Sequence, residues 1–306
     1  MKHNWKITAI IILMFLLTQF VGLYVVNHYS SVKIIDGEKV IVDSPKLPYG
    51  LDNPQVEKEI DFLKMLPSII LSFVMAILIL LFLTRTRSDI VMKIWFFIVV
   101  TLALSITFNS FIPAFKFSTI LALAIALPLS LLKIFKRHFL IHNSTEIFIY
   151  PGIAAIFVSI LNIWTVVIIL LLISFYDMWA VWHTGFMQKM AKYQIKKLKI
   201  FSGFFIPYMT KQIRDKIKKL SPAQLKKKKI QVHVAILGGG DVVFPIIASG
   251  VILKTLGLIP ALLVILGATI GLSILLFLAE KKKFYPAMPF ITFGIFIGII
   301  LGYLII

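Results

Sequence analysis

The sequence predicts an all-α protein, a polytopic membrane bundle of nine transmembrane helices. Three observations predict this fold class. Of the 306 residues, 59% are hydrophobic and only 15% are charged, and the mean hydropathy is +0.97. The apolar residues gather into runs of the length that a helix needs to cross a bilayer, about 20 residues. The lysines and arginines collect in alternate connections between these runs, as in a chain that threads a membrane repeatedly.

The nine expected spans are separated by short polar links, and together they form a single membrane domain over residues 1–306. The first apolar run follows Lys2 and Lys6 like a signal peptide, but no small-residue cleavage site precedes Asn27, so we expect a retained span. The expected spans cover residues 7–26, 64–84, 90–111, 118–133, 147–162, 163–183, 231–252, 258–279 and 284–306.

The basic residues predict the orientation of these spans. If the N-terminus is cytoplasmic, the inside segments hold 25 of the 32 lysines and arginines, fourteen of them between Lys189 and Lys229. The outside segments hold the other seven, and one of them, residues 27–63, also holds seven acids. By the positive-inside rule the N-terminus is cytoplasmic and the C-terminus extracytoplasmic. The net charge of +19 then reflects topology, and we expect no nucleic-acid partner.

Two connections are long enough to hold local structure. In the extracytoplasmic loop 27–63, Asp36-Gly37 lies between alternating residues and predicts a small hairpin. The basic cytoplasmic loop 184–230 is expected to touch anionic lipid headgroups, with a short helix starting at Ser221-Pro222. Its apolar patch at 201–209 predicts an interfacial anchor, with gating or substrate docking as the alternative.

Asp177 and Asp241 are the only carboxylates deep within the predicted spans. A charge at the centre of a membrane helix costs at least about 2.5–3.5 kcal/mol, so each aspartate marks a functional-site hypothesis. Asp177 precedes Lys189 by twelve residues, and Asp241 follows Lys229 by twelve on the next span. At 1.5 Å per helical residue each lies roughly 18 Å from its lysine, so we expect the two acids face to face at equal depth.

Two adjoining buried carboxylates do not both ionise easily, so the pair would hold one proton between them. The ionised member would then take a proton from water while the protonated member polarises a scissile carbonyl, as in aspartic proteases. We expect no metal or other cofactor. The chain has no cysteine, which excludes disulfides, thiolate nucleophiles and cysteine-ligated metals but leaves the redox compartment open.

Three motifs resemble the presenilin and signal peptide peptidase family of intramembrane aspartyl (GxGD) proteases. They are Tyr176-Asp177 in the sixth span, Gly238-Gly239-Gly240-Asp241 in the seventh, and a PAL-type motif, Pro286-Ala287-Met288-Pro289, in the ninth. The resemblance implies that Asp177 and Asp241 are the catalytic pair. It also implies that the substrate is bound by Tyr176, Gly238, Gly239, Gly240, Pro286, Ala287, Met288 and Pro289.

Within this family, the cytoplasmic N-terminus and the proline after Met288 resemble presenilin, in a prokaryotic or archaeal homologue of the cell membrane. Signal peptide peptidases run the opposite way across the membrane and normally have glutamine where Tyr285 stands. The substrates implied are transmembrane helices, such as membrane-protein stubs or signal peptides. Two departures from the family pattern are Met288 for the usual leucine, a near-isosteric change, and Gly239, whose missing side chain would loosen substrate choice.

Two other functions remain open from the residues alone. A proton-coupled transporter would use the two acids as a relay, but it would more naturally show an inverted repeat, and none is visible between the halves. A non-catalytic binder of membrane helices has no reason to keep two buried acids. The oligomeric state, the partner subunits and the physiological substrates do not follow from the sequence.

Overall fold

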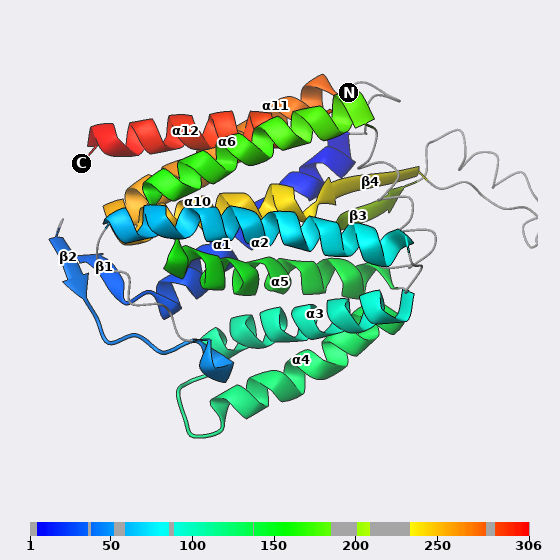
Figure 1. The fold of residues 1–306 in the computed structure, drawn as a ribbon, viewed down its shortest axis with the longest axis horizontal. Coiled ribbons are helices and arrows are strands. Elements are labelled where there is room, and N and C mark those ends of the chain that lie inside the picture. Colours follow the sequence, from blue (N-terminus) through cyan, green and yellow to red (C-terminus); the bar gives the residue numbers. More distant parts are fainter. Residues whose placement is uncertain are drawn as a thin grey trace, which may run out of the picture.

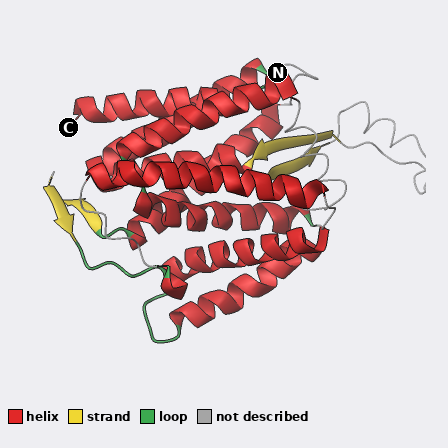
Figure 2. Ribbon diagram, in the orientation of Figure 1, coloured by secondary structure: helices red, strands yellow, loops and turns green. Residues whose placement is uncertain are grey.

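The computed structural model describes residues 5–35, 38–51, 59–85, 89–136, 138–184, 201–208, 233–279 and 285–305. Most of these residues lie in long helices packed side by side, and two short strand pairs lie at opposite ends of the bundle (Figures 1 and 2). The expected short helix near Ser221 and most of the basic loop fall outside the described residues.

The helices occur in the order that the hydropathy pattern predicts. They are α1 (Trp5–Tyr29), α2 (Glu59–Arg85), α3 (Asp89–Phe111), α4 (Ser118–Phe135), α5 (Phe139–Ile160), α6 (Ile163–Trp179), α10 (Gly239–Leu256), α11 (Leu258–Leu278) and α12 (Met288–Ile305). Within the described residues, eight are long and apolar enough to cross a membrane. The ninth, α2, includes the whole of the second expected span, residues 64–84.

Two expected spans start in the wrong place. The fifth was expected from residue 147, but α5 begins at Phe139, because its first two turns carry polar side chains that are buried in the protein instead of facing lipid. The seventh was expected from residue 231, but residues 233–238 form a strand and α10 begins at Gly239. The β-branched and aliphatic run before the three glycines is compatible with either structure by composition, and pairing with a distant segment decides for the strand.

The two strand pairs differ in burial. β1 (Val32–Ile35) pairs antiparallel with β2 (Glu38–Ile41) as the Asp36-Gly37 signal predicts, and β2 is exposed along its length. β3 (Gly203–Tyr208) pairs antiparallel with β4 (His233–Gly238), with Gly203 opposite Gly238 and Tyr208 opposite His233. The predicted interfacial anchor at 201–209 is therefore corrected, since Gly203 and Phe204 are buried within the protein.

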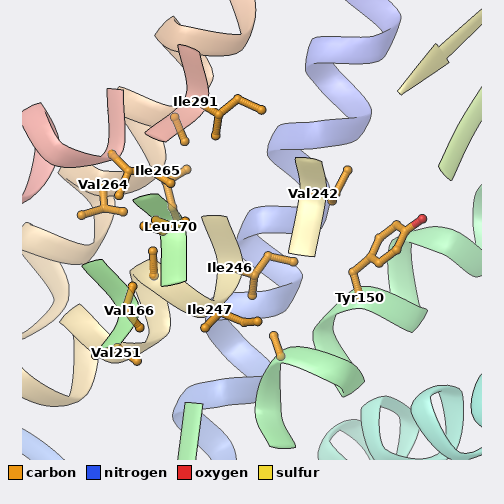
Figure 3. Packing of buried hydrophobic residues seen from close by; sticks show 14 of the residues in the cluster. Tyr150, Val166, Leu170, Val242, Ile246, Ile247, Val251, Val264, Ile265 and Ile291 are labelled. Carbon is orange, nitrogen blue, oxygen red and sulfur yellow. The ribbon is translucent and has the colours of Figure 1, made fainter. Parts of the chain in front are cut away.

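The core surrounds α10. Its buried residues Val242, Ile246 and Val251 pack against side chains of α1, α5, α6, α11 and α12 (Figure 3). α11 and α12 approach each other through glycines: a Cβ on Gly267 would collide with the Gly294 carbonyl, and a Cβ on Gly294 with the Gly267 carbonyl. Small residues allow this backbone contact between membrane helices. α11 and α12 form a close-packed pair, the α11–α12 wall, and α12 also contacts α6.

Candidate active site

Asp177 lies in the last turn of α6 and is 6% exposed. Its carboxyl group is held by another helix: Asp177 Oδ2 accepts a hydrogen bond of 3.0 Å from the backbone N–H of Met288, and the N–H of Ala287 also donates to this carboxyl. Because the first N–H groups of a helix have no partner within it, the start of α12 offers free donors at this point. Asp177 therefore caps α12 across a helix–helix contact.

Asp241 lies in the first turn of α10 and is half-buried. Its carboxyl accepts a hydrogen bond from the backbone N–H of Gly238, the N-cap residue of the same helix. This is the return half of a capping box, in which the third helical residue satisfies the N–H of the N-cap. The acid is thus fixed to the junction between β4 and α10.

The two carboxyl groups lie close enough for an electrostatic interaction between them. Each comes from a helix end on the same side of the bundle, where the chain passes from α6 toward the β3–β4 pair and back into α10 (Figure 1). The helical spacing used to predict the convergence of the acids does not hold, since residues 233–238 are a strand with a longer rise per residue.

The proline-containing motif lies beside Asp177. Pro286 and Met288 are buried, Met288 begins α12, and Pro289 is its second residue. Proline suits the first turn of a helix because its missing N–H would have no partner there. One turn further along α12, Thr292 accepts a hydrogen bond of 2.8 Å from Ser174 of α6, which fixes the two helices beside the acid.

The three glycines lie at the start of α10: Gly238 is its N-cap, and Gly239 and Gly240 are its first two residues. A Cβ on Gly239 would lie 2.8 Å from both the Tyr150 hydroxyl and the Ser202 hydroxyl, so Gly239 permits close packing against α5 and β3. Gly238 abuts Asp241, and Gly240 is exposed, where a Cβ would make ordinary contact with the Phe244 ring at 3.8 Å. A side chain at position 239 would thus point into the protein, toward Tyr150 and Ser202.

Tyr176, which the resemblance places among the substrate-binding residues, precedes Asp177 in α6. Its side chain is exposed on α6, with its ring centroid 6.5 Å from that of Trp179. It therefore forms part of the outer surface next to Asp177 and gives the carboxyl no hydrogen bond that the structure describes.

A third carboxylate within the helical bundle, Glu146, was not predicted from the sequence. Glu146 is 1% exposed in α5, and its Oε1 lies 2.6 Å from Nζ of Lys133. The statement that only two acids lie deep in the spans was wrong, because the expected fifth span began one residue after Glu146. The available signal was the basic residue at the end of one span and the acid at the start of the next, a spacing that an antiparallel helix pair turns into a contact.

An apolar pocket of about 150 Å³ lies between α5, α6 and α10. It is lined only by apolar side chains, including Leu170, Val243 and Phe244, and the last two follow Asp241 by two and three residues. A volume of this size holds one benzene-sized apolar group. Within the described residues, no group of three or more histidine, aspartate or glutamate side chains is arranged to hold a metal ion.

Comparison with known proteins agrees with this geometry. The sequence profile of the family "Signal-peptide peptidase, presenilin aspartyl protease" matches residues 51–306. No curated protein matches the sequence. Two crystal structures of a presenilin family intramembrane aspartate protease are similar in fold. One has a TM-score of 0.59 and 19% identity, covering 98% of this chain and 99% of that one.

The second crystal structure has a TM-score of 0.60 and 18% identity, covering 97% of each chain. These similarities extend over nearly the whole bundle and not only over the motifs, so the three motifs and the fold point the same way. A transporter or a non-catalytic binder is therefore set aside. The chain belongs to the signal-peptide peptidase and presenilin aspartyl protease family, and it is an integral membrane hydrolase, an intramembrane aspartic protease.

Proposed function

We propose that Asp177 and Asp241 together hydrolyse peptide bonds within single transmembrane helices. The observation that carries the proposal is the electrostatic interaction between the two carboxyl groups, one held by the N–H groups of Ala287 and Met288 and the other by that of Gly238. One carboxylate accepts a proton from a water molecule, while the protonated partner donates a hydrogen bond to the scissile carbonyl oxygen. The water oxygen then bonds to the carbonyl carbon, the C–N bond breaks, and the amine leaves with the proton that the first carboxylate took from the water.

The substrate must be partly unwound, because a helix hides its peptide bonds in its own hydrogen bonds. The β3–β4 pair offers an extended partner. The backbone groups of Gly203 and Phe205 in β3 point away from β4 and bond to side chains of α5. In an antiparallel pair, the residues opposite such positions also point their backbone groups away from the partner strand. The N–H and C=O groups of Val234 and Ile236 therefore lie on the outer edge of β4. Among the described residues, no further strand pairs with this edge, which leads directly into Gly238 and Asp241.

We therefore propose that the substrate adds as a strand along the outer edge of β4, a common mode of peptide recognition. The pocket beside Val243 and Phe244 would receive one large apolar side chain of the substrate. Tyr176, Gly238, Gly239, Gly240 and the Pro286–Pro289 motif would border this path. The natural substrates implied are membrane-protein stubs or signal peptides.

We also propose nine membrane crossings with the N-terminus in the cytoplasm. The chain ends lie on opposite sides of the bundle (Figure 1), as an odd number of crossings requires. Exposed tryptophans at the starts of α1 and α3 and at the end of α6, Trp5, Trp95 and Trp179, suit the membrane–water interface on the side of the acids. That side would also carry the basic loop, which would contact anionic lipids of a prokaryotic cell membrane.

The test is cleavage of a transmembrane peptide in liposomes that contain the purified protein. We expect the wild type to cleave, with a rate that falls at both acidic and alkaline pH because one carboxyl must be protonated and the other ionised. Asp177→Ala and Asp241→Ala should each abolish cleavage. The matched control is Asp43→Ala, an exposed aspartate outside the helices, which should cleave like the wild type.

Two results would contradict the proposal. Cleavage that survives either active-site substitution would exclude the aspartate pair. If the wild type cleaved no peptide in a panel that includes helix-forming and helix-breaking sequences, activity on such substrates would be excluded. Equal cleavage of peptides with and without helix-breaking residues near the cut would remove the unwinding step alone.

A further inference from the structure

The β3–β4 pair is attached to the helical bundle by side chains of α5. His142 Nε2 lies 2.8 Å from the carbonyl oxygen of Gly203, Asn143 Nδ2 donates to the carbonyl of Phe205 at 2.8 Å, and the N–H of Phe205 donates to Asn143 Oδ1 at 3.0 Å. These side chains do for the inner edge of β3 what a third strand would do. The hairpin is therefore docked in one register on α5.

Glu146 extends this attachment by one turn. Its Oε1 accepts a hydrogen bond of 3.3 Å from the N–H of Gly203 and lies 3.5 Å from His142 Nε2. The same oxygen forms the ion pair with Lys133, whose side chain is 4% exposed in the last turn of α4. Removing two charges from water is costly, and such a pair is weak support for stability as such. A role in fixing one arrangement explains it better.

The register that Glu146 fixes has no room for adjustment at Gly203. This residue has a φ of 140°, in the region that favours glycine, and a Cβ there would collide with the Leu237 carbonyl of β4. A shift of the strand by one residue would place a side chain at this point. It would also exchange the two faces of the strand.

Glu146 is linked to the start of α10 through Tyr150. One turn along α5 lies Tyr150, which is 2% exposed. Its hydroxyl interacts with Glu146 and Ser202, without a well-formed hydrogen bond among the described residues. The same hydroxyl would lie 2.8 Å from a Cβ on Gly239, the first residue of α10. Glu146 thus contacts β3, which pairs with the strand along the substrate path, and Tyr150, which packs against the first residue of the helix that carries Asp241.

We propose that the buried Lys133–Glu146 pair is a positioning element that fixes the β3–β4 hairpin relative to the two aspartates and thereby decides which peptide bond is cut. This inference rests on the proposed function, in which the substrate lies along β4. Neither residue touches the reacting atoms. Their effect is on where the substrate backbone comes to rest, so their loss should change the position of the cut more than the ability to cut.

The test uses a double variant, because a single substitution would leave the other charge buried alone. Glu146→Gln keeps a carbonyl that can accept from Gly203, and the double variant Lys133→Met/Glu146→Gln removes both charges, which avoids the large penalty of an unpaired buried ion. Products from one reconstituted transmembrane peptide are identified by mass spectrometry. For the double variant we expect cleavage spread over neighbouring bonds, with the main wild-type bond giving about half of the product or less.

The matched control is Lys254→Met. Lys254 is another cation inside the protein, and its Nζ donates to the carbonyl of Val158 at 2.5 Å, at the opposite end of α5. The Lys254→Met variant should be less stable, because a buried hydrogen bond is lost. It should nevertheless cleave the substrate at the same peptide bond as the wild type. A merely structural role for the Lys133–Glu146 pair would make the double variant behave like this control.

A second readout does not depend on cleavage. Hydrogen exchange at the amides of Gly203 and Phe205 should be at least about tenfold faster in the double variant than in the wild type, because the hairpin opens from α5 more often. Unchanged protection, or an unchanged cut position in a folded variant, would overturn the inference. Failure of the proposed function looks different: the wild type would not cleave, or Asp177→Ala would, whatever the exchange at β3.

Discussion

The two aspartates are held in opposite ways. Asp177 is gripped from outside its own helix, by the N–H groups of Ala287 and Met288 at the start of α12. Asp241 is held by its own helix start, through the N–H of Gly238, and the junction beneath it rests on Tyr150 of α5. Asp177 thus depends on the docking of α6 with α12, whereas Asp241 depends on how β4 turns into α10. Damage to either support should misplace one acid and leave the other.

The largest effect on the Asp177 side is expected from Gly294→Leu. A side chain there meets the Gly267 carbonyl of α11, so the backbones must separate. Overpacking of this kind costs about 1–3 kcal/mol. A displacement of about 1 Å at α12 can cost about a hundredfold in rate.

The measurements are the thermal stability of the purified protein and the cleavage rate. Phe293→Ala is the control, since its side chain is exposed on the same helix and should change the rate less than about twofold. Equal rates for Gly294→Leu and the wild type would show that Asp177 does not depend on the α11–α12 wall.

A smaller effect is expected on the Asp241 side from Gly239→Ala. The added Cβ meets side chains and no backbone: the Tyr150 and Ser202 hydroxyls at 2.8 Å and Cε1 of the Tyr150 ring at 2.9 Å. We expect a loss of rate of about three- to tenfold. Adding Tyr150→Phe should restore part of it, because the hydroxyl that meets the Cβ is gone.

Initial rates on one peptide check this prediction, with Ser249→Ala, a buried position further along α10, as the control for general destabilisation. If adding Tyr150→Phe did not raise the rate of the Gly239→Ala variant, the loss of rate would not come from contact with the Tyr150 hydroxyl. A rate for Gly239→Ala lower than that of Gly294→Leu would reverse the order of the two supports.

The smallest structural change is Ser174→Ala, which only removes the 2.8 Å hydrogen bond to Thr292 between α6 and α12. The buried Thr292 hydroxyl would lose its partner, at a cost of about 1–3 kcal/mol. Thr292→Val added to Ser174→Ala should recover stability, because neither partner is then left unpaired. Denaturation midpoints of the four proteins form the cycle, and strictly additive losses would contradict a direct bond.

Much of this arrangement follows from the sequence. Hydropathy and charge placed the helices in the right order, and Asp36-Gly37 located the β1–β2 hairpin, because both signals are local. The two acids were found because a carboxylate in an apolar run is conspicuous. Where local patterns were ambiguous the predictions failed: residues 233–238 are a strand only because they pair with 203–208.

The support of the acids could not be predicted, because it consists of contacts between distant segments. Glu146 looked like a residue of a link, and its burial depends on Lys133 and Gly203 meeting it from two other elements. The backbone N–H of Met288 carries no sequence signal for its bond to Asp177. Gly239 was recognised as part of a motif, but its contact with Tyr150 depends on the packing of α10 against α5.

The most direct test of the central claim, that the two aspartates act as one site, is a double-substitution cycle on cleavage rates. Isosteric Asp177→Asn, Asp241→Asn and the double variant are compared with the wild type on one transmembrane peptide. Residues that act as a unit lose everything with the first substitution, so we predict that each single change lowers the rate by at least about a thousandfold and that the double change lowers it no further. Losses that multiply, or a single variant that keeps about a tenth of the rate, would contradict a shared site.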